Sequence, residues 1–194
     1  MVRCPAAGVG TMPDGRLGRV VAGGGRRAAG LLPRSPRDAV RVWAAEADDE
    51  SFIGEMARLA CMIEGRPLPP VDDPAVVAML PGTSGRALLA VDDDGRRVGA
   101  AWWFFHEPPL LRTEAGAALP ELAVAVVEDA RDRGIGTALI EALAAEASMV
   151  FGRLSLNVHV RNPAVRLYSR TGFVGAGAGR GPLGVAMMRN LRNT

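Results

Sequence analysis

The sequence predicts an α+β domain built on a mixed, mostly antiparallel β-sheet flanked by helices. In the first half, two strand-like runs at residues 86–91 and 98–105 are separated by Asp92-Asp93-Asp94-Gly95, whose Asp-Gly chemistry suits a hairpin turn. In the second half a helical pattern at 134–150 is followed by a strand pattern at 154–160. An antiparallel meander followed by alternating helix and strand is typical of an α+β domain with a mixed sheet.

Each remaining element has its own signal. Between residues 48 and 63, apolar residues recur at helical spacing behind Asp48 or Asp49, either of which can cap a helix. Pro163 suits the first turn of a later helix. A glycine-rich hairpin near 175–184 precedes the last strand. The other expected elements are a strand at 39–45, helices at 48–63, 73–80 and 163–170, and strands at 122–127 and 185–191.

The length and the charge distribution predict one folded domain that follows an N-terminal segment of different composition. The chain has 194 residues and a net charge of +2, enough for a single core. Residues 1–37 are rich in Gly, Arg and Pro, carry seven arginines against one aspartate, and show no periodicity. We predict that they form a disordered extension, either without a role or acting as a cationic arm, and that residues 38–192 form the folded domain.

Several classes of protein are disfavoured. The longest apolar run, Val98–Phe105, is far shorter than the roughly 20 residues that a membrane-spanning helix needs. Arginines interrupt any secretory apolar segment near the N-terminus, and two cysteines cannot make a disulfide framework. The positive excess lies outside the part expected to fold. We therefore expect a cytoplasmic protein with no metal, no nucleic-acid partner and no membrane partner.

One segment carries the features of an anion-binding site. After the strand that ends at Val127, a charged turn leads to Gly134 and Gly136, which open an amphipathic helix. Glycines allow close approach of the backbone, and the free N–H groups of a first helical turn bind anions, a diphosphate above all. A helix opened by glycines without any ligand is the alternative. A dinucleotide fingerprint fits poorly because Leu139 replaces its third small residue, and the absence of lysine excludes a P-loop.

A second motif strengthens the first. Asn162-Pro163-Ala164-Val165-Arg166-Leu167-Tyr168-Ser169-Arg170-Thr171-Gly172-Phe173 directly follows a strand. Together the two segments resemble the GCN5-related N-acetyltransferase family, which carries an Arg/Gln-x-x-Gly-x-Gly/Ala loop and a later Asn-x-x-Ala-x-x-Leu-Tyr-x-x-x-Gly-Phe stretch. Arg131, Gly134 and Gly136 match the first pattern completely. In the second, Asn162 lies one residue closer to Tyr168 than in the commonest form.

The resemblance implies that residues 38–192 are an N-acetyltransferase domain that binds acyl-CoA between splayed strands. The pantetheine arm would pair like an extra strand with one strand edge, and the diphosphate would lie against the glycine loop. The residues that it assigns to the acyl-CoA site are Val124, Ala125, Val126, Arg131, Asp132, Arg133, Gly134, Ile135, Gly136, Thr137 and Asn162.

Two residues are candidates for proton transfer. The resemblance makes Tyr168, the only tyrosine of the chain, the acid that protonates the departing CoA thiolate; packing of the helix is its alternative role. Glu121, at the start of the strand that leads into the loop, could deprotonate the amine or could equally be a surface residue. The strand at 154–160 lacks the glutamate that some family members use on protein N-termini.

We therefore expect an N-acetyltransferase that moves an acetyl group from acetyl-CoA to a primary amine, on a small molecule, by direct attack. A protein or peptide N-acetyltransferase is one alternative, and a non-catalytic acyl-CoA sensor module is another. We also expect the last strand, 185–191, to form a sheet edge that can support a homodimer.

Overall fold

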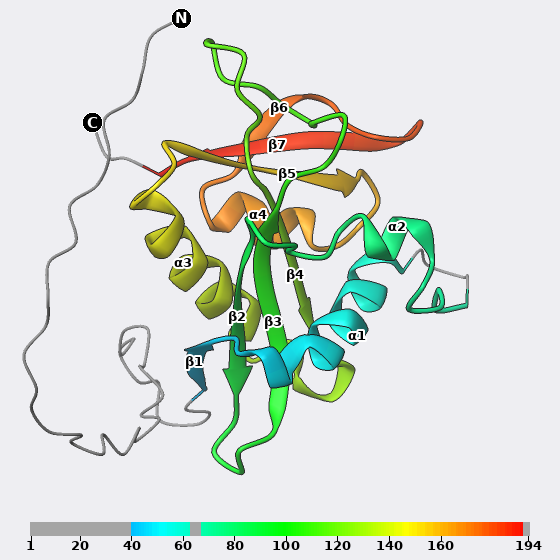
Figure 1. The fold of residues 1–194 in the computed structure, drawn as a ribbon, viewed down its shortest axis with the longest axis vertical. Helices are drawn as coiled ribbons and strands as arrows, with labels where there is room; N and C mark the ends of the chain where they lie inside the picture. The colour runs from blue at the N-terminus through cyan, green and yellow to red at the C-terminus, as the bar shows by residue number, and fades with distance from the viewer. Residues whose placement is uncertain (1–39, 63–66, 192–194) are drawn as a thin grey trace, which may run out of the picture.

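The chain folds into one open, mixed β-sheet with helices on both faces (Figure 1). The computed structural model describes residues 40–62 and 67–191. The seven strands lie in the order β1-β2-β3-β4-β5-β7-β6. Every neighbouring pair is antiparallel except β4 and β5, which are parallel. The predicted fold class is confirmed, whereas the predicted extension at 1–37 and the exact limits 38 and 192 lie outside the described residues.

The elements follow the chain in the order that the sequence predicts. The strands are β1 (Arg41–Ala44), β2 (Arg86–Val91), β3 (Arg97–Phe104), β4 (Glu121–Val126), β5 (Arg153–His159), β6 (Val174–Ala178) and β7 (Gly184–Asn190). The α-helices are α1 (Glu50–Cys61), α2 (Pro74–Val77), α3 (Ile135–Ser148) and α4 (Val165–Arg170), and two 3₁₀ turns are η1 (Ala47–Asp49) and η2 (Glu128–Ala130).

The main departures from prediction lie in weakly patterned segments. The helix expected at 73–80 is a single turn, and the glycine-rich hairpin contains a complete strand, β6. The sequence of β6, Val-Gly-Ala-Gly-Ala, contains one β-branched residue and is mostly exposed, so it lacks both strand propensity and an alternating pattern.

The prediction that residues 185–191 form a sheet edge is wrong. Strand β7 lies between β5 and β6, with which it pairs over its length. The hairpin partner β6 covers the side of β7 that faces away from β5, so the outer edge of this half of the sheet belongs to β6 (Figure 1).

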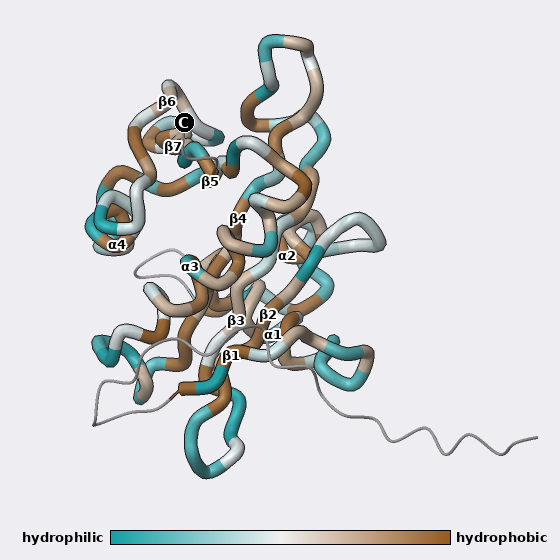
Figure 2. The backbone as a smooth tube through the Cα atoms, turned by 90° about the vertical axis from the view of Figure 1, so that its left-hand side faces the viewer, coloured by the Kyte–Doolittle hydropathy of each residue, from teal (hydrophilic) through white to brown (hydrophobic). Residues whose placement is uncertain are grey.

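Two cores form on the two faces of the sheet. On one face α3 contributes Leu139, Ile140 and Leu143, and on the other α1 contributes Ile53 and Met56. The neighbouring tryptophans of β3 point to opposite faces, because successive side chains of a strand alternate. In Figure 2 the most hydrophobic backbone runs through the central strands and α3, and hydrophilic residues mark the hairpin tips.

The sheet is nearly divided between β4 and β5. These strands share one register pair, Glu121 with Ser155, whereas β3 and β4 are paired from Gly99 to Phe104. At the junction, the N–H and the Oγ–H of Ser155 both donate to the carbonyl oxygen of Pro120, at 2.9 and 3.0 Å. Beyond this point the strands diverge, and β5 and β7 run across the direction of β2 to β4 (Figure 1). The edge of β4 toward β5 is therefore open along Leu122–Val126.

Replacement of Ser155 by Ala tests this junction. The buried hydroxyl is lost while Pro120 keeps the N–H of residue 155, so we expect the free energy of unfolding to fall by about 1 kcal/mol. Ser148→Ala is the matched control, because its hydroxyl donates to Ala145 O at the protein surface and should contribute less than about 0.5 kcal/mol. Urea unfolding measures both, and equal effects would contradict a special role of the junction.

Candidate active site

The open edge of β4 presents backbone hydrogen-bonding groups to the gap. Val127 N–H donates to Val98 O at 3.0 Å, which places the backbone groups of residue 127 on the β3 side. Because N–H and C=O directions alternate along an antiparallel strand, Ala125 also faces β3, whereas Val124 and Val126 face the gap. Of the three strand residues predicted to bind acyl-CoA, only Val124 and Val126 therefore offer main-chain groups to a ligand in the gap.

The chain leads from this edge directly into a backbone anion site. Asp132 and Gly134 both have left-handed backbones, with φ of 60° and 80°. The first backbone hydrogen bond of α3 runs from Ala138 N–H to Gly134 O. The preceding N–H groups, at residues 135–137, therefore lack helical acceptors, and no acidic side chain lies in this first turn. A helix start of this form attracts an anionic group.

The two glycines of the loop are needed for different physical reasons. Gly134 needs its left-handed conformation, and a Cβ atom there would point into open space. At Gly136 the backbone is ordinary, but a Cβ would lie 3.0 Å from Leu167 Cδ2. Gly136 therefore lets α4 pack closely against the start of α3.

A charged side chain of the loop also contacts the backbone of β4. Arg131 Nε donates to Val126 O at 3.2 Å, so this guanidinium lies at the end of the open edge. Arg131 thus joins the β4 edge to the anion site.

Asn162 begins α4. Its Oδ1 accepts a hydrogen bond from Ala164 N–H at 2.9 Å, which is an Asx turn at the start of the helix. This contact explains the asparagine without a ligand, and its predicted contact with acyl-CoA stays a prediction.

Tyr168 lies on α4 and is nearly buried, with 9% of its surface exposed. Its ring meets Phe173 edge to face, with ring centres 6.1 Å apart. Burial raises the pKa of the phenol from 10.0 to about 12, because the phenolate loses its hydration. The hydroxyl therefore keeps its proton throughout the neutral and mildly alkaline range. The alternative role, packing of α4 against the sheet, is also visible in these contacts.

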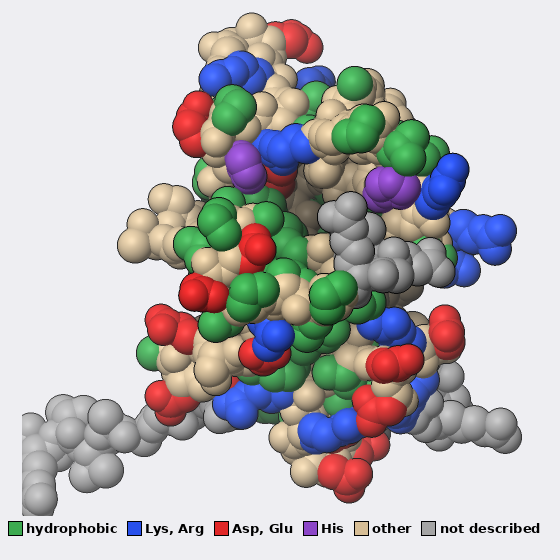
Figure 3. Space-filling model, turned by 90° about the vertical axis from the view of Figure 1, so that its right-hand side faces the viewer, with side chains coloured by type: hydrophobic (Ala, Val, Ile, Leu, Met, Phe, Trp, Pro, Cys, Tyr) green, Lys and Arg blue, Asp and Glu red, His purple; other side chains and the backbone are tan. Residues whose placement is uncertain are grey.

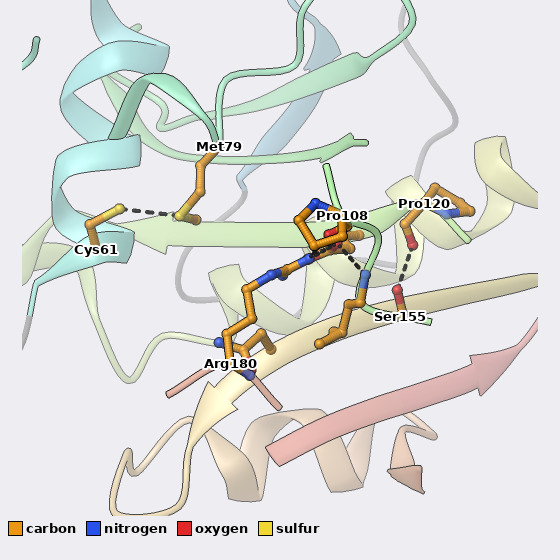
Figure 4. Close-up of polar contacts among 9 residues, drawn as sticks. Cys61, Met79, Pro108, Pro120, Ser155 and Arg180 are labelled. Atoms are coloured by element: carbon orange, nitrogen blue, oxygen red, sulfur yellow. Dashed lines mark hydrogen bonds and ion pairs between the residues drawn. The ribbon is translucent and has the colours of Figure 1, made fainter. Parts of the chain in front are cut away.

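Glu121 is fully buried rather than a surface residue, and it is closely held. Arg180 donates to both carboxylate oxygens, from Nη1 to Oε2 at 2.5 Å and from Nη2 to Oε1 at 2.7 Å. Leu110 N–H donates to Oε1 at 3.2 Å. Figure 4 shows the side chain of Arg180 extending toward Pro108. A buried carboxylate without a partner costs several kcal/mol, so Arg180 makes this burial possible.

Sequence reasoning missed Arg180. It lies 59 residues from Glu121, in the turn between β6 and β7, where no motif marks it. The available signal was indirect: an acidic residue at the start of a central strand, next to a Leu-Ala-Val-Ala-Val run, needs a basic partner somewhere.

Two features are absent from the described residues. Between 40 and 62 and between 67 and 191, no helix is long and apolar enough to span a membrane. Within the same ranges, no group of three or more His, Cys, Asp or Glu side chains could hold a metal ion.

On the face that carries α1 and α2, apolar side chains occupy the centre and charges of both signs are interspersed (Figure 3).

Comparison with known proteins agrees with this architecture. Residues 84–175 match the family model of the acetyltransferase (GNAT) domain. A GCN5-related N-acetyltransferase from Kribbella flavida is 24% identical, with 78% of this chain and 98% of that chain covered and a TM-score of 0.54. No curated protein matches the sequence significantly.

Two further solved structures share the fold. A phosphinothricin acetyltransferase from Sinorhizobium meliloti, in complex with acetyl-CoA, is 21% identical over 79% of this chain and 88% of that chain, with a TM-score of 0.57. The GNAT domain of PAT from S. lividans is 16% identical over 79% and 95%, with a TM-score of 0.59. Residues 84–175 thus form a domain of the GCN5-related N-acetyltransferase family, as the two motifs within them indicated, and the protein is an acyltransferase.

The burial of Tyr168 predicts a loss of stability at high pH. Below pH 10 the phenol is neutral in both states, so it has no effect there. Between pH 10 and about pH 12 the unfolded chain releases its proton first, and the free energy of unfolding should fall by about 1.4 kcal/mol per pH unit. Urea unfolding of Tyr168→Phe should lack this component.

Because Tyr168 is the only tyrosine, the ultraviolet absorbance of its phenolate reports the titration directly. A transition near pH 10 in the folded protein would contradict the burial argument.

Proposed function

We propose that this acyltransferase moves the acetyl group of acetyl-CoA to a primary amine on a small molecule, by direct attack of the amine on the thioester. One observation carries the proposal: the unpaired edge of β4 runs continuously into the anion site at the start of α3. An elongated ligand with amide groups at one end and a diphosphate at the other is complementary to that arrangement.

Acetyl-CoA has this shape and chemistry. Its diphosphate suits the N–H groups at residues 135–137 and the positive side chains of Arg131 and Arg133. Its pantetheine amides suit the main-chain groups of Val124 and Val126 that face the gap. A main-chain N–H near Val126 could polarise the thioester carbonyl as negative charge develops on its oxygen. The acetyl-CoA complex of the S. meliloti structure supports this assignment.

The reaction requires two proton movements. As the amine nitrogen bonds to the carbonyl carbon and the C–S bond breaks, the amine loses a proton and the thiolate gains one. We assign the second transfer to Tyr168, which holds its proton until a thiolate develops. We assign the first to the carboxylate of Glu121, directly or through a water molecule.

The small-molecule acceptor is favoured over a protein acceptor by two considerations. Strand β5 carries no acidic side chain at any position from Arg153 to His159, so the glutamate used there by some enzymes of protein N-termini has no counterpart. One structure with this fold is named for a small-molecule acceptor, phosphinothricin. The intact glycine loop and Tyr168 argue against a sensor module without turnover.

Two measurements test the proposed function. Calorimetry determines whether acetyl-CoA binds, and thiol release is followed with a panel of polyamines, amino acids, aminoglycosides and peptides. The proposal expects binding together with release that depends on a small amine. Release with peptides alone would favour a protein acetyltransferase, binding without any release would favour a sensor module, and absence of binding would eliminate all three.

Replacement of Tyr168 by Phe should lower kcat by about 100-fold or more, because general acid catalysis typically contributes that much. Packing against Phe173 is retained, so acetyl-CoA affinity and Tm near pH 7 should change little. Steady-state thiol release and calorimetry on the same preparation separate the two effects. An unchanged kcat would remove Tyr168 from proton transfer and leave it a packing residue.

Replacement of Gly134 by Ala should weaken acetyl-CoA binding about fivefold, because the free loop can relax away from a φ of 80° and restoring it on binding costs about 1 kcal/mol. Gly95→Ala is a matched control: its φ is 79°, its Cβ would also meet open space, and it lies in the β2–β3 hairpin. In urea and without ligand, neither variant should lose more than about 1 kcal/mol of stability. If Gly95→Ala weakened acetyl-CoA binding equally, the effect would be global strain.

A further inference from the structure

The Glu121–Arg180 pair crosses the gap between the two halves of the sheet. Glu121 starts β4, and Arg180 belongs to the turn that joins β6 to β7 in the other half. Like the junction at Ser155, this ion pair connects the two halves. It lies on the face covered by α1 and α2, toward which Ala123 and Ala125 also point. It therefore lies where the gap opens.

Arg180 is itself held in place by contacts that do not involve Glu121. Its backbone N–H donates to Asn157 Oδ1 at 2.8 Å, and its Nη2 donates to the carbonyl oxygen of Pro108 at 3.0 Å. A Cβ on Gly179 would lie 2.2 Å from Asn157 Oδ1, so the contact with Asn157 requires glycine at that position. Two other segments thus hold residue 180 apart from Glu121: β5 holds its backbone through Asn157, and the loop at Pro108 holds its guanidinium.

These contacts leave one defined position on the carboxylate. An ionised carboxylate offers about four acceptor positions. Among the residues that the structure describes, Oε1 receives Arg180 Nη2 and Leu110 N–H, whereas Oε2 receives only Arg180 Nη1. The remaining position is therefore on Oε2, and rotation of the carboxylate would break its two bonds to the guanidinium.

We propose that Arg180 is a positioning residue for acetyl transfer, which holds the Glu121 carboxylate so that Oε2 faces the acceptor amine. The inference rests on the proposed function and on the assignment of Glu121 as the base. Arg180 acts through Glu121: the amine nitrogen gives its proton to Oε2 as it bonds to the thioester carbon, and the guanidinium stays protonated throughout. The side chain of Arg180 is 30% exposed and that of Glu121 2%, so the pair is approached from the Arg180 side.

Variants at Arg180 test the proposal by thiol release with an accepted amine. Arg180→Ala should lower kcat by about 10-fold or more, because a misplacement near 1 Å can cost up to 100-fold. Arg180→Lys keeps a cation beside the carboxylate but cannot hold both oxygens, so it should recover part of kcat. The Kd for acetyl-CoA should stay within about twofold of wild type, since the anion site at α3 is untouched.

Arg189→Ala is the matched control for loss of an Arg–Glu pair. Arg189 holds both oxygens of Glu141 at 2.9 and 2.8 Å, joining β7 to α3 away from the β4–β5 gap. Its loss should lower Tm without changing kcat. An equal fall of kcat in Arg189→Ala and Arg180→Ala would show that general destabilisation, not positioning, limits turnover.

Glu121→Gln and the double variant Glu121→Gln/Arg180→Lys complete the test. Their kcat values also test the proposal if Arg180→Ala fails to fold. If Arg180 acts through Glu121, Arg180→Lys should cause no further loss of kcat in the Glu121→Gln background. Independent effects that multiply would overturn the proposal, as would full kcat in Arg180→Lys and Arg180→Ala. Wild-type protein that releases no thiol with any amine would instead overturn the proposed function itself.

Discussion

The structure depends on one constraint: β4 and β5 are parallel neighbours that pair at a single position. A sheet normally satisfies the N–H and C=O groups of an inner strand from both sides. Here the outward main-chain groups of Val124 and the N–H of Val126 are left open in the middle of a seven-stranded sheet, while Arg131 Nε donates to Val126 O. A ligand strand that enters the gap would complete the sheet, so substrate binding and the satisfaction of backbone hydrogen bonds become the same event.

The same division explains why a buried ion pair is useful in this fold. Two half-sheets joined at one register pair need a second connection, and an apolar contact there would close the gap that the ligand requires. The bidentate pair of Glu121 and Arg180 connects the halves beside the single register pair of Glu121 with Ser155. A buried pair is weak evidence for stability by itself. Because it lies next to the junction, this pair connects the two half-sheets, which an ion pair elsewhere would not do.

Most of the fold could be predicted from the sequence because most elements bury one face and therefore show periodicity. The glycine loop was also predictable, since a positive φ at Gly134 requires a specific residue type. The exposed strand β6 was missed because little of it is buried, and the position of β7 was wrong because strand order depends on pairing between distant segments. Arg180 was missed for the same reason: its partner is fixed by the fold and not by spacing along the chain.

The close contact between Gly136 and Leu167 has an evolutionary consequence. It joins the start of α3, where the anion site lies, to α4, which carries Tyr168 one residue after the contact. An alanine at 136 requires Leu167 Cδ2 to shift by a few tenths of an ångström, whereas a still larger residue requires either a smaller side chain at 167 or a displaced α4. Among homologous domains that keep this helix spacing, the side-chain volumes at the two positions should vary inversely.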